Sequence, residues 1–349
     1  MTTTISAYAA FERGGPVRPW TYEQRDAREH DVRVEVAYCG ICHTDLHSIG
    51  PWGRSFPLVP GHELVGRVTE TGSAVTAHRV GDLVAVGPVV DSCGQCPPCV
   101  AGQETMCFTV ATATYDAEDR QGDGPTRGGF AEQVIVHERF AYRVPDGLDP
   151  AAVAPLLCAG STVFTPLRHW GAGPGKTVGV IGIGGLGHLG VKFARALGAH
   201  VVAFTTSAAK VEDALALGAH DVVLSSDPER MAAQANRFDL LLDTVPAVHP
   251  MTPYMLTLAP GGTLCSVGLP ASFDVAPFAM VVGRRSLATG GAGGTAETRE
   301  MLDFSAEHRI TADIEIIGPD DINAGLKRLE ANDVKYRFVI DMARTRSEH

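Results

Sequence analysis

A glycine-rich turn between a short apolar strand and a helix constrains the fold of this chain more than any other feature. The run GIGGLGHLG continues directly from the apolar segment VGVI and contains Gly182, Gly184, Gly185 and Gly187. From about residue 177 onward, short apolar segments alternate with amphipathic segments of helical length. Such alternation is typical of βαβ units on a parallel sheet. We therefore predict a doubly wound α/β domain in this part of the chain.

The same glycines indicate a ligand. They permit a tight turn and let a pyrophosphate approach the N-terminus of the next helix, where free N–H groups and the helix dipole favour an anion. A glycine turn without a ligand is the simpler alternative, but the strand before the turn and the helix after it favour dinucleotide binding. Strands are predicted at VGVIGI, HVVAF, DVVL, FDLLLDTV and GGTLCSVG, and helices at GLGHLGVKFARALG, KVEDALALG and residues 251–258.

The end of the next strand favours NADP over NAD. NAD-binding proteins usually place an acidic residue there, against the ribose 2′-hydroxyl. This chain instead carries hydroxyl and ammonium groups at that point, on Thr205, Thr206, Ser207 and Lys210. These groups can bind a 2′-phosphate, and no carboxylate is present to repel it. Alternatively, the hydroxyls cap a helix that Lys210 begins; both interpretations can hold, because a cap and a phosphate site use the same donors.

Four cysteines within fifteen residues predict a structural zinc site. They lie in CGQCPPCVAGQETMC, at Cys93, Cys96, Cys99 and Cys107. Spacings of two, two and seven residues let one loop surround a tetrahedral ion with four thiolates. A disulfide pair or a chance cluster is the alternative. The N-terminal segment MTTTISAYAAFERGG lacks an apolar signal sequence, so we expect a cytoplasmic protein whose thiols stay reduced.

The length of 349 residues predicts two domains. Up to about residue 155, β-rich runs at residues 32–38, 64–70 and 82–86 alternate with Gly and Pro signals, as in an all-β domain with long loops. A helical segment after GGAGG, a segment ADIEIIG, a helix near 320–331 and a strand at 336–341 suggest a return to that first domain. We predict a catalytic domain of residues 1–158 and 293–349, with a dinucleotide-binding domain of residues 159–292 inserted into it.

Charge and hydropathy exclude two classes of partner. The formal net charge is −11, and no stripe of Lys and Arg is present, which argues against nucleic acid. No segment has the ~18 consecutive apolar residues of a membrane-spanning helix. We expect a small-molecule substrate and neither a nucleic-acid nor a membrane partner.

Several motifs together identify a family resemblance. CGICHTDLH, GHELVG, the four-cysteine loop, LLCAG, GIGGLGHLGVKFA and DVKYRFVID occur in this order along essentially the whole chain. In this they resemble the zinc-dependent medium-chain alcohol dehydrogenases, in particular the cinnamyl alcohol dehydrogenase branch and its bacterial aldehyde reductases. The resemblance implies a GroES-like catalytic domain with an inserted Rossmann domain. It also implies a homodimer or homotetramer built by pairing of the dinucleotide-binding domains.

The resemblance assigns roles to scattered residues that spacing alone leaves open, because isolated Cys and His are usually core or surface residues. It implies two zinc ions per chain, one structural and one catalytic. The ligands it implies for the catalytic zinc are Cys42, His62 and Cys158, with Glu63 as an exchangeable ligand. The remaining implied roles are a proton relay through Thr44 and His47, orientation of His62 by Asp45, and packing of Thr162 against the nicotinamide ring.

Some residues keep simpler interpretations. Cys39 and Cys265 are expected in the core, and His188 in a structural role. Trp52 and Phe56 either line an apolar substrate pocket or are exposed loop aromatics. The segment from Ala111 to Gly129 does not match the family residue by residue, and residues 115–129 are expected to form a solvated loop.

The expected function is reversible interconversion of primary alcohols and aldehydes with NADP(H), on aromatic or medium-chain substrates. An NAD-linked alcohol dehydrogenase for small alcohols is the alternative within the enzymes. A non-enzymatic NADPH-binding protein and a zinc-ribbon interaction module fused to a nucleotide domain are the alternatives outside them.

Overall fold

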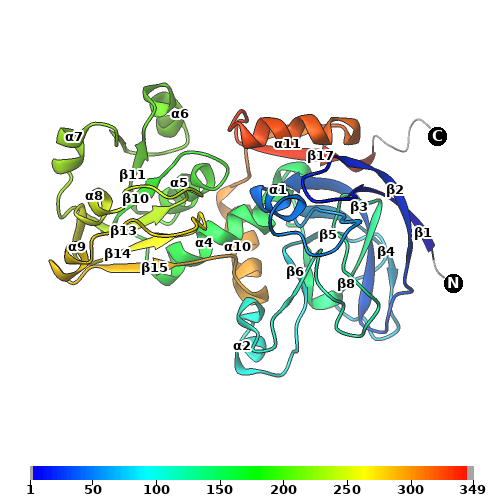
Figure 1. Cartoon of the computed structure of the whole chain (residues 1–349). Coiled ribbons are helices and arrows are strands. Elements are labelled where there is room, and N and C mark those ends of the chain that lie inside the picture. The colour runs from blue at the N-terminus through cyan, green and yellow to red at the C-terminus, as the bar shows by residue number, and fades with distance from the viewer. Residues whose placement is uncertain (1–2, 344–349) are drawn as a thin grey trace. The chain divides into compact units, whose positions relative to one another are not determined.

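The computed structural model describes residues 3–343, and the chain divides into two compact units. The first unit contains the residues up to Cys158 and those from Gly293 onward, and the second unit is Ala159–Ala292. Figure 1 labels most of the helices and strands of both units. The chain therefore leaves the first unit once and returns to it after the second.

A seven-stranded sheet forms the first unit, with strands in the order β16-β17-β3-β4-β5-β9 and with β8 also paired to β3. Two-stranded sheets β1-β2 and β6-β7 accompany it. The strands are β1 Thr3–Ala10, β2 Val17–Gln24, β3 Asp31–Ile41, β4 Leu64–Thr71, β5 Leu83–Val86, β6 Val89–Asp91, β7 Thr112–Ala113, β8 Gln133–His137, β9 Ala141–Arg143, β16 Ile314–Ile317 and β17 Arg337–Asp341. The helices and 3₁₀ turns are α1 His43–Ile49, α2 Pro97–Val100, η1 Glu104–Met106, η2 Glu138–Phe140, α3 Pro150–Val153, η3 Ala154–Leu157, α10 Thr295–His308, η5 Pro319–Asp321 and α11 Ile322–Glu330.

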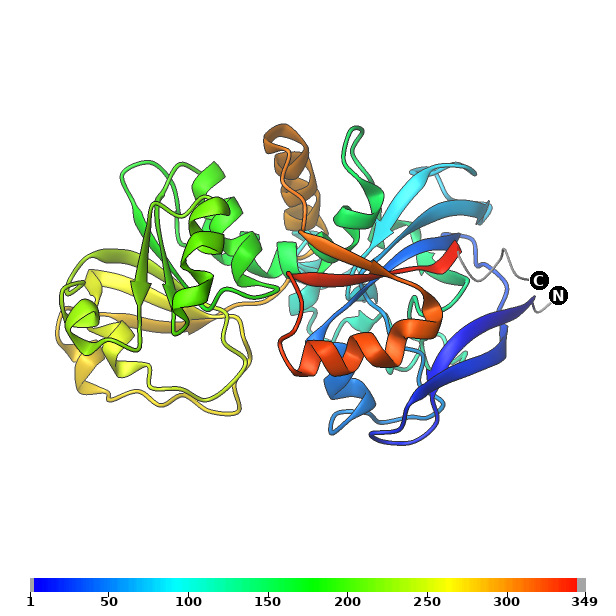
Figure 2. The same ribbon diagram turned by 90° about the horizontal axis from the view of Figure 1, so that it is seen from above.

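Strand β3 is the centre of this sheet because it pairs with three neighbours, β4, β8 and β17. Its alternating residues Val32, Val34 and Val36 are fully buried, as expected for β-branched side chains on a covered face of a sheet. Helix α11 lies against β17 (Figures 1 and 2) and buries Leu326 and Leu329 in the same core. The C-terminal return thus completes the core of the first unit.

The second unit is a six-stranded parallel sheet in the order β12-β11-β10-β13-β14-β15. The strands are β10 Thr177–Ile181, β11 His200–Thr205, β12 Asp221–Leu224, β13 Phe238–Asp243, β14 Leu258–Ser266 and β15 Ser286–Thr289. The helical segments are α4 Ala159–His169, α5 Gly187–Ala196, η4 Ala208–Lys210, α6 Val211–Ala216, α7 Pro228–Ala232, α8 Thr252–Met255 and α9 Phe278–Val281. The strand order reverses between β10 and β13, as in doubly wound sheets.

Side-chain alternation places helices on both faces of this sheet. Gly190 of α5 faces Val180 and Leu242, whereas Leu241, the residue before Leu242, packs in a core cluster with Met255 of α8. Because successive side chains of a strand point to opposite faces, α5 and α8 cover different faces. This arrangement confirms the predicted doubly wound domain.

Most of the predicted elements are observed, and two predictions differ from the structure. Several observed strands, such as β1, β2, β8 and β15, were not predicted. Residues 251–258 were expected to be helical, but the helix is limited to Thr252–Met255 and β14 begins at Leu258. Residues 115–129 carry no helix or strand, but the loop is not fully solvated, because Tyr115 is only 6% exposed.

Among the described residues, no single helix is long and apolar enough to cross a membrane; one bent helix pair, Pro150–Leu157 with Ala159–His169, meets the test by length and composition only.

Candidate active site

The C-terminal end of β3 lies beside the N-terminal ends of β4 and β17, at one end of these strands in the first unit's sheet. Strand β3 ends at Ile41, which pairs with Phe338 of β17, and Cys39 pairs with Leu64 at the start of β4. Both neighbours run antiparallel to β3, so the residues just before β4 and at the start of β17 lie beside the residues just after β3. The pairing therefore brings Cys42 close to His62, although twenty residues separate them in the chain.

Asp45 holds the two sides of this end of the sheet together. It is fully buried, and its Oδ2 accepts a hydrogen bond of 2.8 Å from the backbone N of Cys42, the N-cap residue of α1. Its Oδ1 accepts one of 3.0 Å from the backbone N of Gly61 and lies 3.4 Å from Nδ1 of His62. One carboxylate thus caps the helix and orients the loop that carries the imidazole.

A cluster of four potential ligands forms at this end of the sheet. One ligand atom from each residue lies within 4.8 Å of the others, and the residues are Cys42, His62, Glu63 and Cys158. Cys158 comes from the C-cap of η3, which packs against β3 and β4. The structure therefore assembles the full predicted set from three distant parts of the chain.

The cluster has the chemistry of a cation site. Both ring nitrogens of His62 and Oε2 of Glu63 are buried without a hydrogen-bond partner among the described residues, and leaving such a group unpaired costs about 1–3 kcal/mol. Two thiols and an imidazole are a ligand set that catalytic zinc sites use. A zinc ion held by Cys42, His62 and Cys158 would give one of the unpaired imidazole nitrogens its partner, so these residues fit the predicted metal.

A buried arginine that the sequence pattern does not mark holds Glu63. Arg337, at the start of β17, is 3% exposed and forms an ion pair with Oε1 of Glu63. Burial raises the pKa of Glu63 to about 7, although the Arg337 guanidinium acts in the opposite direction. The motif DVKYRFVID marked this strand, but nothing in its pattern separated Arg337 from ordinary surface arginines.

Thr44 and His47 lie on α1, immediately after Cys42, and both are half-buried. Oγ1 of Thr44 lies 3.6 Å from Sγ of Cys42. The ring of His47 stacks on that of Trp52, with centroids 4.4 Å apart and an interplanar angle of 29°. The helix therefore places Thr44 beside the thiol of Cys42 and His47 further along, against Trp52.

The second cluster is the four-cysteine loop. Its four sulfur atoms all lie within 4.8 Å of one another, and they belong to Cys93, Cys96, Cys99 and Cys107. All four are free cysteines, so the disulfide alternative is not what the structure shows. Four thiols converging from one short loop suit a closed tetrahedral zinc site.

The glycine turn in the second unit is built for close backbone approach. Gly182 has φ +85°, and a Cβ on Gly187 would lie 1.9 Å from the carbonyl oxygen of Gly182. A Cβ on Gly184 would meet no atom within 4 Å, so this position opens outward. Oγ1 of Thr244 donates to the carbonyl oxygens of Ile181 and Gly182 and supports the turn from below. Gly185 is half-buried within the turn.

The residues after β11 differ in their availability. Thr205 is 5% exposed, and its Oγ1 accepts a 3.1 Å hydrogen bond from the backbone N of Ser207. Thr206 is exposed, and Ser207 is the N-cap residue of η4 but makes no side-chain cap hydrogen bond. Nζ of Lys210 donates to the carbonyl oxygen of Ile183, 3.0 Å away, and so reaches the glycine turn. Thr206, Ser207 and Lys210 are therefore freer than Thr205 to meet a ligand.

The remaining residues singled out from the sequence have clear positions. Cys39 and Cys265 are fully buried, which confirms their core assignment. His188 is fully buried with Nδ1 3.1 Å from the carbonyl oxygen of Gly184, a structural role as predicted. Thr162 lies half-buried on α4.

Comparison with known proteins decides the family. The model of the alcohol dehydrogenase GroES-like domain matches residues 28–146, and the zinc-binding dehydrogenase model matches residues 185–307. The chain is 49% identical to aldehyde reductase YahK of Escherichia coli over 342 residues, which cover 97% of this chain and 98% of that protein. The chain belongs to the zinc-binding dehydrogenase family. It is therefore an oxidoreductase, as the resemblance predicted.

Further members of the family are similar over the whole chain. NADP-dependent alcohol dehydrogenase C 1 of Mycolicibacterium smegmatis is 48% identical and covers 99% of this chain and 100% of its own. The structure of a cinnamyl alcohol dehydrogenase of Sorghum bicolor has a TM-score of 0.94 at 42% identity, covering 98% of both chains. That of Helicobacter pylori, complexed with NADP(H), has a TM-score of 0.92 at 34% identity, covering 99% of both. These likenesses confirm the predicted GroES-like and Rossmann domains.

Proposed function

We propose that this zinc-binding dehydrogenase interconverts primary alcohols and aldehydes with NADP(H), and that its substrates are aromatic or medium-chain. The observation that carries the proposal is the buried cluster of Cys42, His62 and Cys158, whose donors suit a catalytic zinc. Relatives named as an aldehyde reductase and NADP-dependent alcohol dehydrogenases support the reaction and the cofactor.

The site residues of the first unit have distinct roles in this proposal. A zinc ion bound by Cys42, His62 and Cys158 supplies a Lewis acid for the substrate oxygen. Asp45 keeps His62 in the orientation and tautomer that a metal ligand needs. Thr44 and His47 transfer the proton between the substrate oxygen and solvent.

In the proposal, Glu63 has two alternative partners, the guanidinium of Arg337 and the metal ion. The guanidinium binds Oε1 of Glu63, while Oε2 has no hydrogen-bond partner among the described residues, and the residue as a whole belongs to the ligand cluster. In the proposal Glu63 is the exchangeable ligand, and Arg337 determines how readily its carboxylate is released. Releasing the carboxylate from this pair would leave a buried charge without its partner, which is costly.

The cofactor preference rests on the residues after β11. No carboxylate follows this strand, and Thr206, Ser207 and Lys210 offer two hydroxyls and an ammonium. We assign the 2′-phosphate of NADP(H) to these three residues, with its pyrophosphate at the glycine turn and with the cofactor supplying the hydride. Thr162 is assigned to the nicotinamide ring.

A Thr206→Asp variant tests this assignment. Its carboxylate should repel the 2′-phosphate, so we expect kcat/KM for NADPH to fall at least tenfold while that for NADH is unchanged or rises. Initial rates with both cofactors and one aldehyde measure the ratio. Thr252→Asp, on α8, is the control with the same change of charge. An unchanged NADPH/NADH ratio in Thr206→Asp would contradict the assignment of the 2′-phosphate to this residue, and a wild type that prefers NADH would favour the NAD-linked alternative.

We further propose a cytoplasmic homodimer or homotetramer. Strand β15 is at the end of the six-stranded sheet, and Phe278 and Val281 of the preceding α9 are 74% and 73% exposed. A second copy of the strand can extend such an edge. Eight free cysteines agree with a reducing compartment. Analytical ultracentrifugation of the zinc-loaded protein should give at least twice the monomer mass, whereas a monomer would refute the assembly.

A further inference from the structure

The segment that could not be matched to the family contains a residue that joins two loops. Asp116 lies in the 111–129 loop, between β7 and β8, and its backbone has the left-handed φ of 56°. Oδ2 of its carboxylate accepts a 3.0 Å hydrogen bond from the backbone N of Arg54. Oδ1 accepts bonds from the backbone N and the Oγ of Ser55, at 3.0 and 2.9 Å. One side chain therefore fixes a segment sixty residues earlier.

The segment that it fixes carries Trp52. We call residues 50–57 the Trp52 loop; it follows α1 directly. The backbone N of Trp52 donates to the carbonyl oxygen of His47, 2.8 Å away, and the two rings stack. Trp52 itself remains 48% exposed. Trp52 thus presents an aromatic surface to solvent beside His47. In the proposed function, His47 is the residue of the proton relay nearest the solvent.

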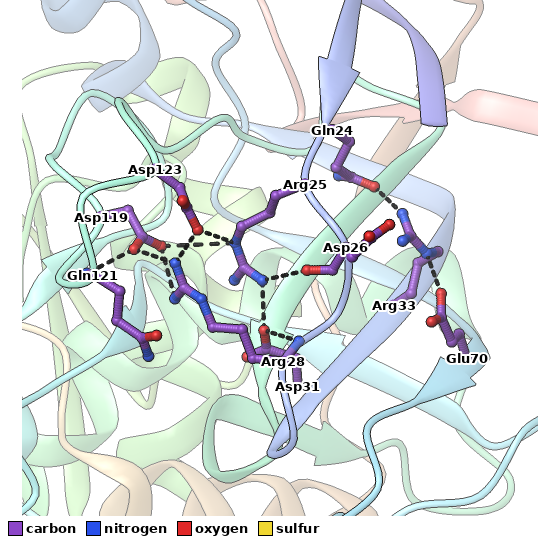
Figure 3. Close-up of polar contacts among 10 residues, drawn as sticks. All are labelled: Gln24, Arg25, Asp26, Arg28, Asp31, Arg33, Glu70, Asp119, Gln121 and Asp123. Atoms are coloured by element: carbon purple, nitrogen blue, oxygen red, sulfur yellow. Dashed lines mark hydrogen bonds and ion pairs between the residues drawn. The ribbon is translucent and has the colours of Figure 1, made fainter. Parts of the chain in front are cut away.

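The 111–129 loop is itself anchored at its tip. Figure 3 shows Arg28, in the turn between β2 and β3, reaching Asp119 and Asp123 of this loop. The bond from Nη2 of Arg28 to Oδ1 of Asp119 is 2.6 Å long. Arg25 approaches the same two carboxylates and pairs with Asp31, 2.6 Å away. The loop is therefore held at its tip and can serve as a fixed support.

Tyr115 anchors the near end of the loop. It is 6% exposed, and its ring centroid lies 5.7 Å from that of His62. The next residue, Asp116, is thus placed by a buried neighbour on one side and by the Arg28 contacts on the other. Because the loop is held at Tyr115 and at Asp119 and Asp123, Asp116 has a fixed position. Its three hydrogen bonds therefore restrain the Trp52 loop.

We propose that Asp116 is a positioning residue for substrate selection: it holds the Trp52 loop so that the exposed face of Trp52 receives the apolar part of an aromatic aldehyde. This inference rests on the proposed function. Asp116 does not touch the substrate but acts through Ser55 and Arg54. Small aliphatic aldehydes, which are too short to need this aromatic surface, should not depend on it.

Tryptic cleavage after Arg54 tests the anchoring without any assay of activity. Arg54 is exposed, so access to the Arg54–Ser55 bond depends on how firmly the loop is held. In the zinc-loaded protein, Asp116→Ala should raise the initial rate of this cleavage about tenfold, as expected for the loss of hydrogen bonds. The control is Glu118→Gln, at an exposed position of the same loop that the anchoring contacts do not use. Equal cleavage rates in wild type and Asp116→Ala would overturn the proposal.

Kinetics test the consequence for selection. We expect Asp116→Ala to raise KM for cinnamaldehyde about tenfold, with KM for butyraldehyde and for NADPH changed less than twofold. Asp116→Asn keeps one oxygen that can accept the hydrogen bonds of Ser55. Its KM for cinnamaldehyde should therefore lie between those of wild type and Asp116→Ala. Ser55→Ala removes only the hydroxyl bond; it should shift KM for cinnamaldehyde two- to threefold and keeps the test informative if Asp116→Ala does not fold.

The outcomes separate the inference from the function on which it rests. If wild type reduces both aldehydes but Asp116→Ala loses both equally, Asp116 is merely structural and the proposal fails. If wild type reduces neither aldehyde, the proposed function fails, and the proposed role in selection fails with it. The cleavage rate then still decides whether Asp116 anchors the Trp52 loop.

Discussion

Asp45 shows how one residue can organise a metal site that it does not join. Its two oxygens serve the backbone N of Cys42 and of Gly61 and face the imidazole of His62. The ligand geometry is thus determined before a metal binds. Cys42 is tied to this carboxylate directly, because its own backbone N donates a hydrogen bond to it.

Replacement of Cys42 tests the ligand assignment. Cys42→Ser should lower the zinc content from two ions per chain to one and reduce kcat at least a hundredfold, because the site loses a thiolate. The fold should remain, since Ser is nearly isosteric. Zinc analysis by mass spectrometry, circular dichroism and initial rates measure the three quantities. Cys99→Ser is the matched control and should lose the other zinc ion; full turnover by Cys42→Ser would show that the assignment is wrong.

His249 gives the second unit a pH-dependent contact at the carboxyl end of β13. Its Nε2 lies 3.2 Å from Oδ2 of the fully buried Asp243, and this hydrogen bond raises the pKa of His249 above 6.5, with a smaller contribution from Asp274. Because the folded pKa is the higher one, the stabilisation is complete below pH 6.5 and is lost as pH rises through the raised pKa.

A His249→Gln variant should therefore lower Tm more at pH 6 than at pH 9. Thermal unfolding of the zinc-loaded protein at both pH values measures the difference, with His308→Gln on α10 as the control. An equal loss of Tm at both pH values would mean that the charge of His249 contributes nothing to stability.

At the scale of elements, Glu104 joins the four-cysteine loop to the helix that follows the return of the chain. This carboxylate, 1% exposed in η1, accepts bonds of 2.8 and 2.9 Å from the backbone N and Oγ1 of Thr295, at the N-terminus of α10. It also pairs with Arg139 at 2.7 Å. The carboxylate of Glu104 thus accepts a hydrogen bond from a backbone N–H that has no partner within the helix. It also places a negative charge at the positive end of the helix dipole.

Glu104→Ala should lower the free energy of unfolding by about 2 kcal/mol, because it leaves the buried N–H of Thr295 without an acceptor. Urea unfolding of the zinc-loaded protein measures the loss. Glu307→Ala, at an exposed position of α10, is the control and should change stability by less than about 0.5 kcal/mol. A loss no larger than that of the control would refute the role of Glu104.

Elements with strong local patterns were predictable from the sequence, and contacts between distant segments were not. The helix at TAETREMLDFSAEH matches α10, Thr295–His308, and the strands from Thr177 onward match β10 to β14 closely. The helix near 251–258 was overestimated, because its apolar residues also suit the strand that begins at Leu258. Tyr115 and Asp116 could not be interpreted, because their partners lie some sixty residues away and no local pattern marks them.

At the scale of the whole chain, the two ligand sets followed from different kinds of information. The four-cysteine loop is local, so spacing alone identified it. Cys42, His62 and Cys158 are far apart, and only the order of motifs along the chain connected them. Arg337 was missed because its partner, Glu63, is 274 residues away and the pairing of β17 with β3 brings them together.

The most direct test of the account is cinnamaldehyde reduction by NADPH, measured as initial rate before zinc removal by a chelator, after removal and after zinc is restored. We predict that the rate falls to background as zinc leaves Cys42, His62 and Cys158, and that it returns when two zinc ions per chain are bound again. An undiminished rate in protein that lacks zinc at this cluster would contradict the account.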